Sequence, residues 1–170
     1  MKKLKIRSYT EAGVNLKKVH KIQNTINNVL FKTKNQYTTN FLVGHYAGLF
    51  SFNNANFCIH TDGVGTKILV AQALKKHDTI GIDAIAMNDN DIVCIGAKPI
   101  IGVDYIALSR EDDKLVKEIF KGLIKGCKLS NIALVGGETA ILPDMFQSNS
   151  SQTYYDLAMS VVGVCEREII

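Results

Sequence analysis

The sequence has no run of eighteen apolar residues, and no apolar stretch follows the basic start at residues 1–4. A helix needs about 20 apolar residues to span a bilayer, and a secretory signal carries an apolar region directly after its basic start. These absences exclude a membrane-spanning helix and a signal peptide. We therefore predict a cytosolic protein that does not bind a membrane.

Cysteine is also scarce and scattered. The four cysteines, Cys58, Cys94, Cys127 and Cys165, lie far apart among apolar or small neighbours, with no Cys-x-x-Cys pair. A zinc site or a disulfide framework needs closer and more regular spacing. We expect reduced cysteines that pack in the core.

Aromatic residues are few in the most basic part of the chain. Residues 1–34 carry nine Lys and Arg against one acidic residue, whereas the net charge of the whole chain is +4. Single-stranded nucleic acids are bound by positive charge together with aromatic rings that stack on bases. We therefore expect no nucleic-acid partner. A phosphorylated small molecule or an acidic face of a partner subunit explains the charge bias as well.

The composition does supply enough apolar material for one globular domain over residues 1–170. Hydrophobic residues make up 46% of the chain and charged residues 21%, as in a domain with a buried core. Hydrophobic periodicity predicts the main elements. Helices are predicted at 16–30 with Asn15 as N-cap, at 68–74, at 79–96 with Asp78 as N-cap, and at 111–130; strands at 56–59, 100–108, 132–135 and 154–165; an extended arm at 1–13; and a long connection at 32–55.

A stretch with two glycines follows the first predicted strand. Residues 60–67 read His-Thr-Asp-Gly-Val-Gly-Thr-Lys, which we interpret as the turn between a strand and a helix. Gly63 and Gly65 let the backbone approach a phosphate closely, N–H groups at the helix start point at it, and Lys67 adds a cation. Asp62 would repel that phosphate unless Mg²⁺ lay between them. An ordinary glycine turn with a solvated Asp and Lys is the open alternative; the spacing excludes a Walker A motif and a dinucleotide fingerprint.

Two other segments combine polar groups with element ends. Residues 88–91, Asn-Asp-Asn-Asp, interrupt an apolar helical segment, as either an exposed helix edge or a second set of Mg²⁺ or phosphate contacts. Residues 136–138, Gly-Gly-Glu, follow a predicted strand and form a second junction of the same kind as the first. Asp104 lies inside a predicted strand, where a structural ion pair and a site residue are both open.

Together these stretches resemble the N-terminal domain of the aminoimidazole ribonucleotide synthetase family, the phosphoribosylformylglycinamidine cyclo-ligases. The matching segments keep the family's order from residue 9 to about 165: Tyr9-Thr10-Glu11-Ala12-Gly13-Val14, Thr61-Asp62-Gly63-Val64-Gly65-Thr66-Lys67, His77-Asp78-Thr79-Ile80-Gly81-Ile82-Asp83, Asn90-Asp91-Ile92-Val93, Gly96-Ala97-Lys98-Pro99, Asp104-Tyr105 and Val135-Gly136-Gly137-Glu138-Thr139-Ala140. Several motifs in register are far more specific than one.

The resemblance implies an α+β fold, a mixed β-sheet with helices on one face, whose sheet pairs with a second copy into a dimeric β-barrel. It implies ATP and Mg²⁺ as cofactors and formylglycinamidine ribonucleotide as substrate: ATP phosphorylates the amide oxygen, and an internal nitrogen displaces phosphate to close the imidazole ring. By motif match, the metal ligands are Asp62, Asp91 and Glu138, and the phosphate contacts are Gly63, Gly65, Thr66, Lys67 and Asn90. No acid or base is assigned.

The chain departs from the family pattern at Thr10, where the family usually has Lys, at Ile141, where it tends to have an acid, and at Asp144, where it tends to have glycine. Family members also carry a second domain of similar size. We therefore expect half an active site, whose second domain belongs either to a longer protein from which this chain was cut or to a separate partner chain. The resemblance itself implies a homodimer. Two alternatives stay open: formylglycinamidine ribonucleotide synthetase, which normally lacks the Tyr-x-x-Ala-Gly-Val arm, and a non-catalytic nucleotide-binding dimerisation module.

Overall fold

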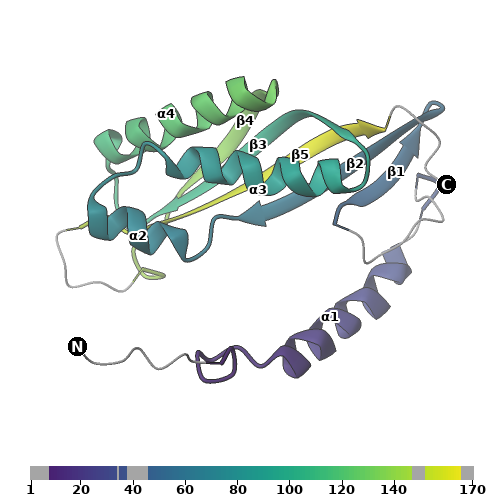
Figure 1. Cartoon of the computed structure of the whole chain (residues 1–170), viewed down its shortest axis with the longest axis horizontal. Coiled ribbons are helices and arrows are strands. Elements are labelled where there is room, and N and C mark those ends of the chain that lie inside the picture. Colours follow the sequence, from purple (N-terminus) through teal and green to yellow (C-terminus); the bar gives the residue numbers. More distant parts are fainter. Residues whose placement is uncertain (1–7, 34, 38–45, 147–151, 166–170) are drawn as a thin grey trace.

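A five-stranded mixed sheet organises the chain in a computed structural model (Figure 1). The structure describes residues 8–33, 35–37, 46–146 and 152–165. Its elements are α1 (Leu16–Leu30), η1 (Phe31–Thr33), β1 (Gly48–Phe52), β2 (Ala55–Gly63), α2 (Lys67–Leu74), α3 (Ile80–Cys94), β3 (Lys98–Leu108), α4 (Asp113–Ser130), β4 (Ala133–Ile141) and β5 (Tyr155–Cys165). The strand order is β1-β2-β5-β3-β4, in which only the β3 and β4 pair is parallel. The predicted α+β fold with a mixed sheet is confirmed; the sheet is open in the single chain.

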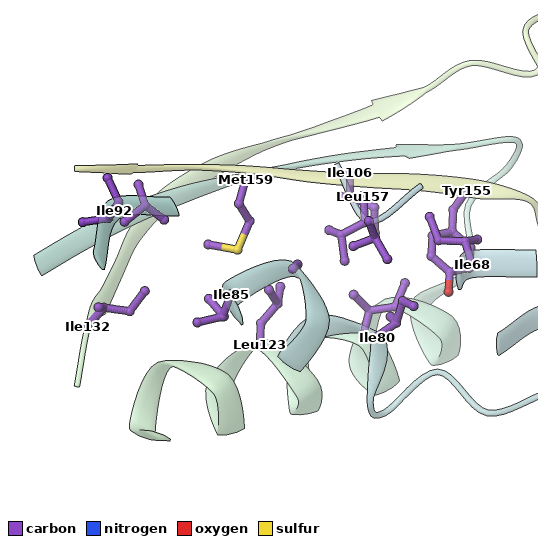
Figure 2. Close-up of a cluster of buried hydrophobic side chains, with 14 of the residues drawn as sticks. Ile68, Ile80, Ile85, Ile92, Ile106, Leu123, Ile132, Tyr155, Leu157 and Met159 are labelled. Carbon is purple, nitrogen blue, oxygen red and sulfur yellow. The ribbon is translucent and has the colours of Figure 1, made fainter. Parts of the chain in front are cut away.

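Helices α3 and α4 cover one face of this sheet, as predicted. Along β5, Tyr155, Leu157 and Met159 are at most 4% exposed, while Asp156 between them is exposed. Figure 2 shows these buried side chains between the sheet and the helices, opposite Ile85 of α3. Burying each large aliphatic side chain contributes roughly 1.5–3 kcal/mol, so this interface holds the domain together.

Glycines bring the two covering helices close to each other. A Cβ at Gly81 of α3 would overlap the backbone nitrogen of Leu123 and lie 2.7 Å from the carbonyl oxygen of Ile119, both in α4. Backbone atoms cannot move aside as a flexible side chain can. The close approach of α3 to α4 therefore depends on glycine at this position.

The opposite face of the sheet carries exposed apolar side chains. Ile59 of β2 and Ile101, Val103 and Tyr105 of β3 are 37–47% exposed. Each alternates in sequence with side chains that point toward the helices, because successive residues of a strand face opposite sides. We call the side carrying these four residues the open face.

Helix α1 lies apart from the sheet (Figure 1). Its predicted N-cap is confirmed, since Asn15 Oδ1 accepts a hydrogen bond from the backbone nitrogen of Lys18 at 3.2 Å. The predicted apolar stripe is present but exposed, with Ile22, Ile26 and Val29 at 50–59% exposure. No helix in the described part of the chain has both the length and the apolar character needed to cross a membrane.

Of two predictions for the chain before β2, one was incomplete and one was wrong. The connection at 32–55, expected to hold only small pieces of structure, contains the sheet strand β1, which forms a hairpin with β2 through Asn53 and Asn54. Both asparagines have positive φ, 49° and 62°, as the turns that suit the twist of a hairpin require. The arm is not extended over residues 8–14, where Val14 N donates to Tyr9 O at 2.8 Å in a turn; residues 1–7 lie outside the described residues.

Two predicted element ends also move. Helix α3 has Thr79 as its N-cap residue, and Asp78, the predicted cap, instead pairs with Lys76 Nζ at 2.9 Å. Strand β4 continues through Gly136, Gly137 and Glu138, so the second glycine motif lies inside a strand. The predicted junction at the end of 132–135 is therefore wrong.

Candidate metal and phosphate site

The first glycine motif joins β2 to α2, as predicted, although the strand continues to Gly63. The turn comprises residues 64–66, and Gly65 has a φ of 67°, in the left-handed region that favours glycine. Val64 anchors the turn, because its side chain is 3% exposed and its backbone nitrogen donates to Leu157 O at 2.9 Å. Helix α2 begins directly afterwards at Lys67.

The motif forms a cluster with α3. His60 and Asp62 alternate with Thr61 along β2, so both side chains lie on the side covered by α3. Asp91 of α3 meets them: its Oδ2 is 3.0 Å from His60 Nε2, and one potential ligand atom from each of the three residues lies within 4.8 Å of the others. We call His60, Asp62 and Asp91 the His-Asp-Asp cluster. Its nitrogen and carboxylate oxygens are chemically suited to a divalent cation.

Asn88 fastens this cluster from α3. Its side chain is fully buried, and its amide nitrogen donates to Ala84 O at 3.0 Å and to the backbone oxygen of Asp62 at 3.4 Å. Asp62 Oδ1 in turn accepts from Gly63 N at 2.8 Å. These bonds hold the end of β2 against α3, so the helix segment 88–91 is not simply an exposed edge.

Sequence reasoning missed His60 and Asn88 as site residues. The signal for His60 was its place two residues before Asp62 in a strand, which puts both side chains on one face. No local spacing connects His60 with Asp91, because they come from different elements.

The predicted phosphate contacts lie in different settings, and Gly63 among them is the last residue of β2. Gly65 and Thr66 border a cavity of about 390 Å³ that Phe146 and Tyr154 also line. Lys67 instead pairs with Asp83 Oδ1 at 2.9 Å, which is the alternative role of a lysine at a helix start. Asn90 is exposed and does not belong to the His-Asp-Asp cluster.

Within a single chain, Glu138 lies far in space from the His-Asp-Asp cluster. Paired residues Asp62, Met159, Asp104 and Gly137 form one row across the sheet on the side of the helices. Glu138 follows Gly137 and therefore points to the open face. With neighbouring strands about 4.8 Å apart, β4 lies about 14 Å from β2. The structure thus brings Asp62 and Asp91 together and does not bring Glu138 to them.

Asp104 is a buried carboxylate outside the His-Asp-Asp cluster. It is 6% exposed and forms no ion pair with the described residues. Burial raises the pKa of its carboxyl group above the ordinary value. Burial likewise raises the pKa of Asp89, which is 5% exposed on α3. Neither side chain is part of the His-Asp-Asp cluster.

Curated relatives are similar in sequence to nearly the whole of this chain. Phosphoribosylformylglycinamidine cyclo-ligase of Pyrococcus furiosus is 44% identical over 165 residues, which cover 95% of this chain and 48% of the relative. The Saccharolobus solfataricus protein of the same name is 40% identical over 160 residues, 94% of this chain and 47% of the relative. The chain thus spans about half the length of the curated relatives it matches.

Solved structures share its fold. A structure titled AaThiL complexed with AMPPCP and TMP has a TM-score of 0.64 at 16% identity, and covers 84% of this chain and 41% of its own. PurLQS from Thermotoga maritima has a TM-score of 0.55 at 11% identity, over 69% of this chain and 19% of its own. The family described as AIR synthase related protein, N-terminal domain, matches residues 44–165. The chain therefore belongs to the AIR synthase related family, as an N-terminal domain.

Proposed function

We propose that this chain supplies the Mg-ATP-binding, dimer-forming half of an ATP-dependent cyclo-ligase. The reaction would convert formylglycinamidine ribonucleotide to aminoimidazole ribonucleotide in purine biosynthesis. The observation that carries the proposal is the His-Asp-Asp cluster, of which His60 and Asp62 lie directly before a glycine turn and the N-terminus of α2. Support comes from the relatives named cyclo-ligase and from a fold neighbour complexed with AMPPCP, an ATP analogue.

The residues present suit a magnesium nucleotide. Asp62 and Asp91 offer the hard carboxylate oxygens that Mg²⁺ prefers in proteins. Bound Mg²⁺ would neutralise phosphate charge, which is most of what phosphoryl transfer requires from its site. The backbone at Gly65 and Thr66 leaves room for a phosphate, and the N-terminus of α2 favours negative charge there. The adjoining cavity of about 390 Å³, with its aromatic side chains, would receive the rest of the nucleotide.

The remaining predicted contacts, Lys67 and Glu138, do not reach the proposed site in the structure of the single chain. Lys67 would have to leave Asp83 to reach a phosphate, and both side chains of that pair are at least 40% exposed, so the exchange costs little. Glu138 could share the metal of Asp62 only if a second copy brought it there. These two residues are therefore the parts of the proposed site that depend most on assembly and ligand binding.

The open face supports the dimer. Four apolar side chains gather on it without helix cover, and exposed apolar patches of this kind mark interaction sites. A second copy would bury the face in an isologous, two-fold interface. We expect the chain to sediment as a dimer and Val103→Lys as a monomer. Leu129→Lys, at an exposed position of α4, is the matched control that should remain dimeric.

A calorimetric titration of Mg-ATP into the 170-residue chain, with an EDTA control, tests the nucleotide role. We expect saturable binding that EDTA removes. Asp113→Asn, on the surface of α4, should bind as the parent chain does. Saturable binding that persists in EDTA would overturn the assigned metal role, and no binding would overturn the claim that this half binds Mg-ATP without the second domain.

A further inference from the structure

We propose that His60 is a metal ligand, so that the His-Asp-Asp cluster is a mixed nitrogen and oxygen site for a divalent first-row transition metal. This goes beyond the proposed magnesium role, which uses carboxylates only. The inference shares Asp62 and Asp91 with that role, but it concerns the metal in the absence of nucleotide.

The geometry at His60 suits a ligand better than a hydrogen-bond donor. Nε2 is buried and lies 3.0 Å from Asp91 Oδ2, yet it has no partner in hydrogen-bonding geometry among the described residues. A ring N–H aimed at a carboxylate oxygen at this distance would form a hydrogen bond. Two adjacent ligands of an octahedral ion at about 2.1 Å lie about 3 Å from each other. The separation therefore fits two donor atoms aimed at one shared cation.

A second buried polar atom next to the cluster, Asn88 Oδ1, has no hydrogen-bond partner in the described part of the chain. Asn88 is fully buried, and its Oδ1 accepts no hydrogen bond from the described residues, although its amide nitrogen contacts the backbone of Asp62. Orphaned buried polar atoms are rare in folded proteins, and a bound ion or water is a common reason for them. Two such groups, at His60 and Asn88, flank the same Asp62.

The ligand set determines the class of metal. Magnesium prefers oxygen ligands and gains little from an imidazole, whereas first-row transition metals bind imidazole nitrogen and carboxylate oxygen together. For a site with nitrogen and oxygen donors, affinity rises from Mn²⁺ to Co²⁺. We therefore expect Mg²⁺ to bind this cluster more weakly than Mn²⁺, and Mn²⁺ more weakly than Co²⁺.

Manganese is a suitable probe because the spectrum of bound Mn²⁺ shows whether a nitrogen atom is coordinated to it. Mn²⁺ is titrated into the full chain without nucleotide, free Mn²⁺ is counted by electron paramagnetic resonance, and bound Mn²⁺ is examined by electron spin echo envelope modulation. We expect one Mn²⁺ per chain with nitrogen modulation from a coordinated imidazole. Bound Mn²⁺ without nitrogen modulation, or no binding at millimolar Mn²⁺, would overturn the proposal. The parent chain alone decides this, so a poorly folded variant cannot obscure it.

Variants then identify the imidazole. His60→Gln should lose the nitrogen modulation and weaken Mn²⁺ binding by about tenfold or more, while Mg²⁺ binding changes much less. His20→Gln, at an exposed histidine of α1, is the matched control and should keep both the modulation and the affinity. Modulation that survives in His60→Gln would assign the nitrogen to another residue and overturn the role of His60. Because no nucleotide is present, failure here leaves the Mg-ATP titration as a separate test.

Discussion

The two glycine motifs look alike in sequence but lie in different settings. Residues 62–65 end a strand, and their carboxylate lies beneath α3 beside His60 and Asp91. Residues 136–138 lie inside the edge strand β4, and their carboxylate points to the open face. The comparison shows that a glycine next to a carboxylate in the sequence does not by itself make a metal or phosphate site. The face of the sheet decides which other side chains can reach that carboxylate.

The largest expected effect separates the two carboxylates. Asp62→Asn should abolish metal-dependent nucleotide binding, because an amide oxygen lacks the negative charge with which a carboxylate holds Mg²⁺. Stability should change little, since the asparagine oxygen can still accept from Gly63 N. Glu138→Gln should lower divalent metal affinity less than about twofold. Calorimetric titration and thermal melts of both variants check this; an equal loss in Glu138→Gln would show that a second copy brings Glu138 to the cluster.

The glycines of the second motif should differ from each other in stability. A Cβ at Gly137 would overlap Asp104 Oδ1 and lie 2.9 Å from its carbonyl oxygen, whereas a Cβ at Gly136 meets nothing closer than 4.0 Å. Gly137→Ala should lower the free energy of unfolding by about 2–3 kcal/mol, and Gly136→Ala by much less. Denaturant unfolding compares the two. Equal losses would mean that backbone freedom, rather than close packing, explains the glycine pair.

The glycines of the first motif should differ for another reason. A Cβ at Gly65 would meet nothing within 4 Å, but the residue has a φ of 67°, whereas Gly63 has ordinary contacts and no positive φ. Gly65→Ala should therefore cost about 1 kcal/mol of strain, and Gly63→Ala less. Denaturant unfolding again measures the difference. A larger loss at Gly63 would contradict the view that the turn, and not the strand end, needs glycine.

The smallest expected effect concerns the carboxyl group under Gly137. Burial raises the pKa of Asp104, so the folded protein holds this proton more tightly than the unfolded chain does. This stabilisation is complete below pH about 4 and is lost as pH rises through the raised pKa. From pH 4 to 7, the parent chain should lose Tm relative to Asp104→Asn, whose side chain does not titrate. Thermal melts across this range would refute the account if the two chains shifted together.

Asp112 is a control with the opposite sign. The backbone N–H of Leu115 bonds to its carboxylate and lowers its pKa. Its stabilisation is present above the ordinary pKa of Asp and is lost as pH falls through the lowered value. At neutral pH, Asp112→Asn should therefore melt below the parent chain, whereas Asp104→Asn should melt higher relative to the parent than it does at low pH. At low pH, where both carboxyl groups of the parent are protonated, each variant should approach the parent in Tm.

The sequence was sufficient to predict helices and strands with strong hydrophobic periodicity. It was not sufficient for β1 and β4, whose extent depends on contacts with other parts of the fold. Helices at 16–30 and 111–130 and the last strand follow from their apolar stripes. The hairpin of β1 was missed because Asn53-Asn54 lacks the glycine that usually marks such a turn. Strand β4 was cut short because two adjacent glycines suggest a loop, although here one of them permits close contact with Asp104.

The site was predicted in part for a similar reason. Asp62 and Asp91 were predicted as ligands of one metal, and the structure places them in one cluster. The assignment of these two residues to one metal came from the family resemblance. Their partner His60 depends on how β2 packs on α3, which periodicity alone does not give. The same packing explains Lys67, whose partner Asp83 lies on α3 as well.

The most direct test of the central claim is where a divalent metal binds in a crystal of the chain. Crystals soaked in Mn²⁺ would be measured near the manganese absorption edge, and the anomalous difference map would locate the ion. We predict a peak between Asp62 and Asp91 at the edge of α3, within about 2.2 Å of a carboxylate oxygen of each. A peak at Glu138 on the open face, with none at Asp62, would contradict the account.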